Sequence, residues 1–266
     1  MIQFRGVSAR YPREAREALH DVSIMVPAGA LTAIVGPNGS GKSTLVRLLL
    51  RRLRAHTGGI ELDARALEAF DARTFARRVA VVPQRESAVF SLPVREYVAL
   101  GRYPHEGPWR AATSRDAALV EQAMVDAGVS DLGARDILAL SGGEWQRARI
   151  ARALAQGGDA LVFDEPTTFL DVGHEMAMFE LFATLARRGR AVLVISHQLN
   201  LIARFADAMV LLHLGQVVAA GPPQVVMQAT TLEGVYQWPL VVTRDPAVGA
   251  PALVPLRRSS RAASSE

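Results

Sequence analysis

The sequence predicts an α/β fold in which a mostly parallel sheet is flanked by helices and a helical lobe is inserted into the core. Two observations support this prediction. Short apolar runs rich in β-branched residues alternate with segments of helical spacing along most of the chain. One long stretch, residues 84–140, breaks that alternation and offers no further apolar run that could form a central strand.

The predicted strands are apolar throughout, as expected of strands that are buried on both faces of a parallel sheet. They lie at residues 31–35, 79–82, 160–163, 191–195 and 209–212. The segments with helical spacing lie at residues 43–52, 115–127, 144–155 and 175–187. Strands that alternate with helices in this way are typical of α/β domains.

The stretch that breaks the alternation is predicted to be a helical lobe. It contains the prolines Pro93, Pro104 and Pro108. The rest of it is mostly helical in pattern. After Gly221, a pair of prolines is expected to open a short helix. The final residues 259–266 are small and polar, so we expect them to form a disordered tail.

The composition limits the possible classes of protein. The chain has 266 residues, 50% of them hydrophobic, which is enough for one large domain or one domain with an inserted lobe. It has no cysteine, which excludes disulfides and thiolate metal sites. No apolar run reaches the roughly 18–20 residues of a membrane span and the start does not resemble a signal peptide, so a cytosolic setting is expected. The formal net charge is only +4 without a basic stripe interleaved with aromatics, so no nucleic-acid partner is expected.

A candidate phosphate-binding loop follows the first of these strands. Its residues are Gly36, Pro37, Asn38, Gly39, Ser40, Gly41, Lys42, Ser43 and Thr44. A strand, a Gly-x-x-x-x-Gly-Lys-Ser loop and a helix in this order form a P-loop. The glycines let backbone N–H groups face the β-phosphate of a nucleotide, and Lys42 brings a point charge to the β- and γ-phosphate oxygens. The Ser43 hydroxyl is positioned to bind Mg²⁺.

Two adjacent carboxylates end the strand at residues 160–163. Asp164 and Glu165 lie where open α/β sheets bind their ligands, at the carboxyl edge of the strands. We expect Asp164 to be an outer ligand of Mg²⁺ and Glu165 to accept a proton from the attacking water. A kinase, a GTPase or a helicase could have the same two features, so the class of nucleotide enzyme depends on other residues.

The deciding segment is residues 140–154, which read LSGGEWQRARIARAL. Ser141 can cap the following helix, and Gly142 and Gly143 leave backbone N–H groups bare at its positive end, which makes a second anion site. The segment closely resembles the signature of ABC ATPases. That resemblance implies ATP as the nucleotide and a head-to-tail homodimer in which each signature helix faces the γ-phosphate held by the other subunit.

Other positions resemble this family in chain order, from about residue 2 to residue 223. The resemblance implies that Tyr11 stacks on adenine, that Gln84 senses Mg²⁺ and water, that Asp171 links the two subunits, and that His197 touches the γ-phosphate. It also implies an N-terminal antiparallel β portion in addition to the P-loop NTPase core. Two residues depart from the family pattern. Gln198 stands where an acid is usual, and Trp145 is an uncommon occupant of the signature helix.

The resemblance implies the following organisation and role. Residues 1–240 form the ATPase domain, with the helical lobe at about 85–155, and residues 241–266 form a partly disordered C-terminal extension. Residues 98–105, 167–174 and 197–207 look like the ATPases of metal-chelate importers, which carry iron-siderophore, haem or cobalamin. The lobe, especially residues 84–105, would then contact an integral membrane permease at the cytoplasmic face of the bacterial inner membrane. A periplasmic or surface substrate-binding protein would act only indirectly.

Two alternatives remain open at this stage. The chain could serve another cargo, or it could be a soluble ABC ATPase of DNA repair, iron–sulfur assembly or translation. DNA-repair members would need a long coiled-coil insertion and ribosomal members two tandem cassettes, whereas this sequence has one P-loop, one signature and no heptad run. The transport function is therefore favoured.

Overall fold

The centre of the molecule is a six-stranded sheet with the strand order β10-β9-β3-β8-β7-β6. The computed structural model describes residues 1–12, 14, 16–105, 113–168 and 170–257. The strands of this sheet are β3 (Leu31–Val35), β6 (Val79–Val82), β7 (Ala160–Asp164), β8 (Ala191–Ile195), β9 (Ala208–His213) and β10 (Gln216–Gly221). Neighbours pair in parallel except β10, which runs antiparallel to β9. The predicted mostly parallel sheet is confirmed.

A smaller antiparallel sheet carries the N-terminus and has the strand order β2-β1-β4-β5. Its strands are β1 (Ile2–Ala9), β2 (Leu19–Val26), β4 (Thr57–Leu62) and β5 (Arg65–Ala66). Side chains of β3 alternate between two cores: Leu31 and Val35 lie in one, and Ile34 lies in the core shared with this second sheet. Helix α1 (Lys42–Leu49) buries its apolar side in the same shared core.

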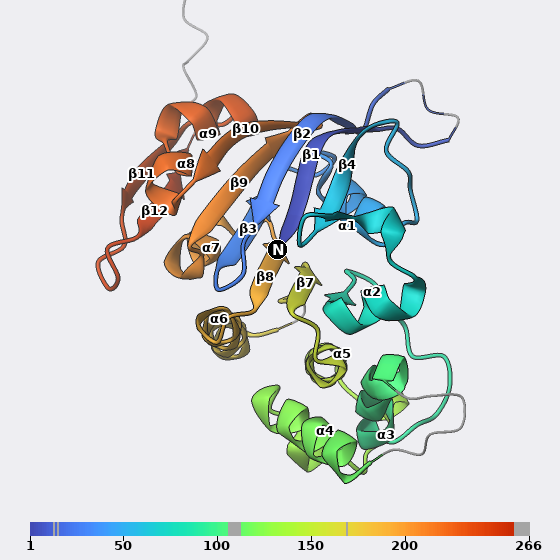
Figure 1. Ribbon diagram of the computed structural model, residues 1–266. Coiled ribbons are helices and arrows are strands. Elements are labelled where there is room, and N and C mark those ends of the chain that lie inside the picture. Colours follow the sequence, from blue (N-terminus) through green and yellow to red (C-terminus); the bar gives the residue numbers. More distant parts are fainter. Residues whose placement is uncertain (13, 15, 106–112, 169, 258–266) are drawn as a thin grey trace, which may run out of the picture.

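The helical lobe lies at the opposite end of the molecule from the C-terminal helices (Figure 1). It contains α3 (Val94–Ala99), α4 (Ser114–Asp126) and α5 (Gly142–Gln156). Two of these helices begin with a capping box, Thr113 with Asp116 at α4 and Ser141 with Glu144 at α5. Helix α5 also packs along β6, so it joins the lobe to the central sheet.

Most of the remaining helices pack against the central sheet, two of them against its interior strand β3. They are α2 (Ala72–Arg78), α6 (Val172–Arg187), α7 (Leu199–Phe205), α8 (Pro223–Val226) and α9 (Ala229–Tyr236). Short 3₁₀ turns occupy Leu67–Ala69, Leu100–His105, Ser130–Leu132 and Ile137–Ala139. In the part of the chain that the structure describes, no helix combines the length and the apolar character needed to cross a bilayer.

A hairpin that the sequence analysis did not predict follows α9. Its strands are β11 (Leu240–Arg244) and β12 (Pro251–Pro255), and they pair in antiparallel fashion. The side chain of Asn200 fixes the hairpin to α7: its Oδ1 accepts from the backbone N–H of Leu253 at 2.7 Å, and its Nδ2 donates to the carbonyl of the same residue at 3.0 Å. The predicted disordered tail at 259–266 lies outside the described residues.

Candidate functional site

The phosphate-binding loop connects β3 to α1, and two of its glycines have conformations that other residues cannot adopt. Gly36 has φ +149°, and a Cβ there would lie 2.0 Å from the carbonyl oxygen of Leu212. Gly41 has φ +107° immediately before α1, where a Cβ would lie 2.8 Å from the carbonyl oxygen of Ala18. The loop therefore needs glycine at these two positions to fit against the neighbouring backbone.

Lys42, the first residue of α1, directs its ammonium group back into the loop. Its Nζ donates to the carbonyls of Gly36 at 2.7 Å and Pro37 at 2.9 Å. Burial lowers the pKa of Lys42, and the nearby charges of Glu165 and Asp164 oppose that shift. Among the described residues, the ammonium has only neutral carbonyls as hydrogen-bond acceptors, so an anionic phosphate oxygen would be a stronger partner.

Asp164 ends β7 and faces the loop. It is buried, and no donor in the described part of the protein bonds its Oδ1. Burial, followed by the charge of Glu165, raises its pKa to about 6, although Lys42 and the backbone N–H of Gln84 oppose this. A buried carboxylate oxygen without a partner is costly, and a cation would satisfy it. Asp164 therefore fits a Mg²⁺ ion.

The next residue, Glu165, has a backbone conformation that is unusual for a non-glycine residue, with φ +51°. This backbone directs the side chain toward the loop after β8, where His197 Nδ1 donates to Glu165 Oε2 at 2.8 Å. The Glu165 side chain is 10% exposed and that of His197 is 64% exposed. The two residues come from neighbouring parallel strands, and their contact connects the two strand ends.

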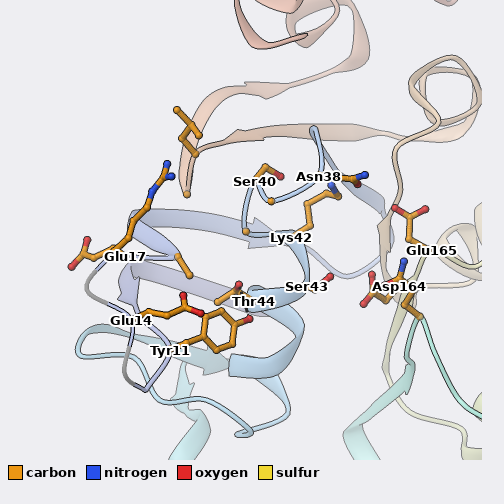
Figure 2. Close-up of a pocket in the computed structure, with 17 residues that line it drawn as sticks. Tyr11, Glu14, Glu17, Asn38, Ser40, Lys42, Ser43, Thr44, Asp164 and Glu165 are labelled. Atoms are coloured by element: carbon orange, nitrogen blue, oxygen red, sulfur yellow. Dashed lines mark hydrogen bonds between the residues drawn. The ribbon is translucent and has the colours of Figure 1, made fainter.

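Lys42, Asp164 and Glu165 line one cavity of about 380 Å³, whereas His197 lines a neighbouring hollow together with Gln198. Figure 2 shows Lys42 and Ser43 between Tyr11 on one side and the two carboxylates on the other. Of the residues predicted from the sequence, the cavity is lined by Tyr11, Asn38, Gly39, Ser40, Gly41, Lys42, Ser43, Thr44, Gln84, Asp164 and Glu165. A volume in this range is typical of a small-molecule site.

Tyr11 forms the wall on the side of the cavity away from the carboxylates. Its hydroxyl lies 3.1 Å from Thr44 Oγ1, which fixes the ring beside the loop. Arg47 was not predicted from the sequence, and its guanidinium carbon lies 5.3 Å from the centre of the Tyr11 ring. Arg47 lies five residues after Lys42 on the predicted helix, and this position was the signal that could have identified it as a residue near the site. The sequence analysis also missed the wall residues Glu14, Arg16, Glu17, Ala18, Leu214 and Gly215.

Several predicted residues are not among those that line this cavity: Gly36, Pro37, Ser141, Gly142, Gly143, Asp171 and His197. Ser141 accepts from the backbone N–H of Glu144 as the N-cap of α5, and Gly142 and Gly143 form the first turn of that helix. Asp171 caps α6 and accepts from His174 Nδ1 at 2.8 Å. Within one chain, the second predicted anion site is therefore separate from the phosphate-binding loop.

The two residues that depart from the family pattern both make specific contacts. Gln198 donates from Nε2 to Glu175 at 2.7 Å and accepts from Thr167 Oγ1 at 3.1 Å. An acid at this position would face the carboxylate of Glu175, so the amide removes a repulsion. Trp145 donates from Nε1 to the backbone carbonyl of Glu86 at 3.0 Å.

The cavity has a chemical organisation suited to a nucleotide bound with a metal. It offers a cation within a loop of backbone N–H groups, and opposite these an unpartnered buried carboxylate oxygen and a second carboxylate held by a histidine. No cluster of three or more His, Cys, Asp or Glu side chains that could hold a metal occurs among the described residues. Mg²⁺ is commonly held by one or two carboxylates together with substrate phosphates, which is the set available here.

Known proteins are similar to most of this chain. The ABC transporter family model matches residues 19–168. The hemin import ATP-binding protein HmuV of Nocardia farcinica is 43% identical over 243 residues, 91% of this chain and 84% of that protein. The iron(3+)-hydroxamate import ATP-binding protein FhuC of Bacillus subtilis is 36% identical over 237 residues, 89% of this chain and 88% of that protein.

Solved structures agree with these relatives. The chain is similar to a metal-chelate type ABC transporter in an inward-facing conformation, with a TM-score of 0.83 and 26% identity, covering 97% of this chain and 98% of that one. A dimeric bacterial ABC transporter cassette has a TM-score of 0.74 and 26% identity, and the match covers 84% of this chain and 98% of that one. With its P-loop, carboxylates and signature helix in this order, the chain belongs to the ABC transporter family as one of its ATP-binding cassettes.

Proposed function

We propose that this chain is the ATP-hydrolysing subunit that energises a bacterial importer of metal chelates. The observation that supports hydrolysis most directly is the carboxylate of Glu165, which His197 holds at the edge of a cavity that also contains Lys42. A carboxylate in this place can accept a proton from water while the ammonium faces the phosphates. The cavity therefore has the groups that phosphoryl transfer to water requires.

Each predicted residue then has a role in that reaction. The ammonium of Lys42 and the backbone N–H groups of residues 36–44, apart from Pro37, hold the phosphates, and Tyr11 provides a face for adenine. Ser43, Asp164 and Gln84 would hold Mg²⁺. When bound, Mg²⁺ neutralises charge on the β- and γ-phosphate oxygens. Glu165 accepts the proton of the attacking water, Gln84 and His197 orient the reacting groups, and Lys42 stabilises the charge that develops.

A second copy of the chain completes the site in this proposal. Ser141, Gly142 and Gly143 lie outside the chain's own cavity. The backbone N–H of Ser141 donates to Glu144 Oε2 at 2.8 Å, whereas the N–H groups of Gly142 and Gly143 have no acceptor within the first turn of α5 and are available to a nucleotide bound elsewhere. Pairing two copies head to tail would bring each signature helix to the other copy's γ-phosphate, with Asp171 near the junction. A cassette similar to this chain has been solved as a dimer, which supports the arrangement.

The cargo class is inferred from the relatives. Their names assign hemin to HmuV, iron(3+)-hydroxamate to FhuC and ferric enterobactin to FepC of Escherichia coli, which is 36% identical over 90% of this chain. The cobalamin import protein BtuD of Halobacterium salinarum is 39% identical, although the match covers 61% of that protein. We infer that this chain binds a permease at the cytoplasmic face of the inner membrane, and that a substrate-binding protein delivers the chelate to that permease. The relatives favour this function over DNA repair, iron–sulfur assembly or translation.

Transport in vesicles tests this function. The complex of this chain with its membrane partner would be reconstituted and supplied with ATP and, in separate trials, ferric siderophore, haemin or cobalamin. We expect uptake of one of these chelates that stops without ATP. ATP-dependent uptake of another cargo would contradict the chelate assignment, and ATP hydrolysis without any transport would contradict the importer function.

Coupling to the permease should depend on the exposed part of the lobe. Tyr103 is 74% exposed on the 3₁₀ turn Leu100–His105. Arg95 is also exposed, but its guanidinium forms an ion pair with Glu121 on the surface of the lobe. We expect Tyr103→Glu to reduce transport and permease-stimulated ATP turnover by about tenfold, the scale of one lost interface residue. Nucleotide affinity of the isolated subunit should stay unchanged because Tyr103 does not line the cavity.

Arg95→Glu provides the comparison. The charge of Arg95 is already paired within the lobe, so a defect there would combine interface and local packing effects. Normal transport by Tyr103→Glu would remove this residue from the interface. Equal loss of transport and nucleotide affinity would mean that the lobe had misfolded.

A further inference from the structure

A short segment after β6 connects the nucleotide cavity to the signature helix α5. Gln84 lines the cavity, and its backbone N–H lies close enough to Asp164 to lower the pKa of that carboxyl. Two residues later, Glu86 has turned away from the cavity and its side chain lies against α5 and α3. Because Glu86 lies only two residues after Gln84, a displacement of the backbone at Gln84 is expected to move Glu86 as well.

Side chains of the lobe bind both oxygens of the Glu86 carboxylate. Arg152 binds it with both terminal nitrogens, Nη1 to Oε1 at 2.6 Å and Nη2 to Oε2 at 2.8 Å. The hydroxyl of Tyr97 donates to Oε1 at 2.9 Å, and Arg149 Nε lies 3.5 Å from Oε2. Burial tends to raise the pKa of Glu86, but the hydrogen bonds and charge of Arg152 outweigh it and the pKa is lowered. A two-point fork between a guanidinium and a carboxylate fixes orientation as well as distance.

The backbone of the same segment is bound to α5 near its start. Trp145, in the first turn of α5, donates from Nε1 to the carbonyl of Glu86 at 3.0 Å, and its ring lies 4.8 Å from that of Tyr97. Arg149, whose side chain is 4% exposed, donates to the carbonyl of Pro83. The residues on both sides of Gln84 are therefore attached to one helix.

Helix α5 also contacts the segment after the second carboxylate. Gln146 donates from Nε2 to the carbonyl of Pro166 at 2.9 Å, and its Oε1 accepts from Arg149 at 2.6 Å. Pro166 directly follows Glu165. The start of α5 is thus tied to both walls of the cavity, the wall with Gln84 and the wall with Glu165, through buried hydrogen bonds that resist rearrangement.

We propose that Glu86 and Trp145 are positioning residues that set where the signature turn, Ser141–Gly143, lies relative to Gln84. Glu86 holds the segment to the middle of α5, and Trp145 holds it to the first turn, next to the signature. Neither residue lines the nucleotide cavity, so their effect is on the signature presented to a second copy rather than on the chain's own binding of nucleotide. This inference rests on the proposed head-to-tail arrangement.

The test uses Glu86→Gln and Trp145→Phe, with Glu96→Gln, an exposed glutamate of α3, as the matched control. Glu86→Gln removes the charge from the fork, whereas Trp145→Phe removes only the indole donor and leaves the fork intact. Each variant is assayed for nucleotide affinity as a monomer, for kcat and KM of ATP hydrolysis, and for melting temperature. A Glu165→Gln background then gives the ATP concentration needed for dimer formation.

For both variants we expect kcat to fall between about tenfold and 100-fold, the range for a misplaced reacting group. Nucleotide affinity of the monomer should stay within about twofold of the unchanged chain, a difference of less than about 1 kcal/mol, because neither side chain lines the cavity. KM should rise together with the ATP concentration needed for dimerisation. The ATP concentration needed for dimerisation should rise about tenfold or more, and the control should match the unchanged chain.

Three outcomes would overturn the inference. Glu86→Gln and Trp145→Phe could both match the control in kcat and dimerisation. Nucleotide affinity and kcat could fall together with the melting temperature, which would mean that the residues only support the fold. Trp145→Phe could match the control while Glu86→Gln alone lowers every property. If the unchanged chain neither hydrolyses ATP nor dimerises, the proposed function fails instead.

Discussion

Replacing Glu165 with glutamine should stop ATP hydrolysis while ATP binding persists. The amide can still hold the attacking water, but it cannot accept a proton from it. The loss of a general base lowers turnover by about 100-fold to 10,000-fold. We expect the upper part of this range, because among the described residues Asp164 is the only other carboxylate near Lys42, and Asp164 is assigned to Mg²⁺. The measurement is phosphate release under saturating ATP.

The same variant should accumulate as an ATP-bound dimer. Because hydrolysis no longer removes the γ-phosphate, the contact between this phosphate and the second copy's signature helix is retained. Gel filtration with ATP and Mg²⁺ reports the dimer, and the unchanged chain under turnover conditions is the reference. A Glu165→Gln variant that hydrolyses ATP at the normal rate would exclude Glu165 as the base. A variant that remains monomeric with ATP would count against the two-copy site.

Replacing Lys42 with alanine should abolish nucleotide binding or turnover. In the part of the chain that the structure describes, the ammonium bonds only to neutral carbonyls of its own loop, and it is the cation closest to the phosphates in the proposed site. Hydrogen bonds to charged groups contribute about 1.5–3 kcal/mol each, so we expect affinity or turnover to fall at least about tenfold, with turnover falling further because charge develops there. Lys42→Arg, which keeps the charge but is larger and planar, separates charge from fit.

A second measurement exploits the composition of the chain, because Lys42 is its only lysine. An amine-directed reagent that carries a phosphate, such as pyridoxal phosphate followed by reduction, should modify Lys42 and the N-terminal amine only. ATP should protect Lys42 and leave the N-terminus reactive, as mass spectrometry of the peptides can show. Appreciable phosphate release by Lys42→Ala, or labelling of Lys42 that ATP does not reduce, would contradict the assignment of the phosphate-binding loop.

The sequence was most informative where physical constraints on local structure are strong. The strands at 31–35 and 160–163 are apolar throughout because both of their faces are covered, and the structure has β3 and β7 there. The glycines of the loop were recognisable because Gly36 and Gly41 need backbone conformations that only glycine adopts easily. The N-terminal antiparallel portion was expected only from the family resemblance, and β1 and β2 form it.

Contacts between residues far apart in the chain were not predictable from the sequence. The fork between Glu86 and Arg152 joins residues 66 positions apart, and neither residue belongs to a local pattern. The hairpin of β11 and β12 depends on Asn200, which lies 53 positions before Leu253. Such pairs are created by the packing of α5 and α7, so their identities follow only from the folded chain.

Isolation of this chain from its native cells tests the central claim most directly. The chain would be tagged and recovered from detergent-extracted membranes, and its partners identified by mass spectrometry with the stoichiometry measured. The account predicts recovery of a membrane protein with multiple spans, with two copies of that protein and two copies of the cassette in each complex. It also predicts that this partner is released when the lobe surface at Tyr103 is altered. Recovery of the chain only from the soluble fraction, with no membrane protein bound, would contradict it.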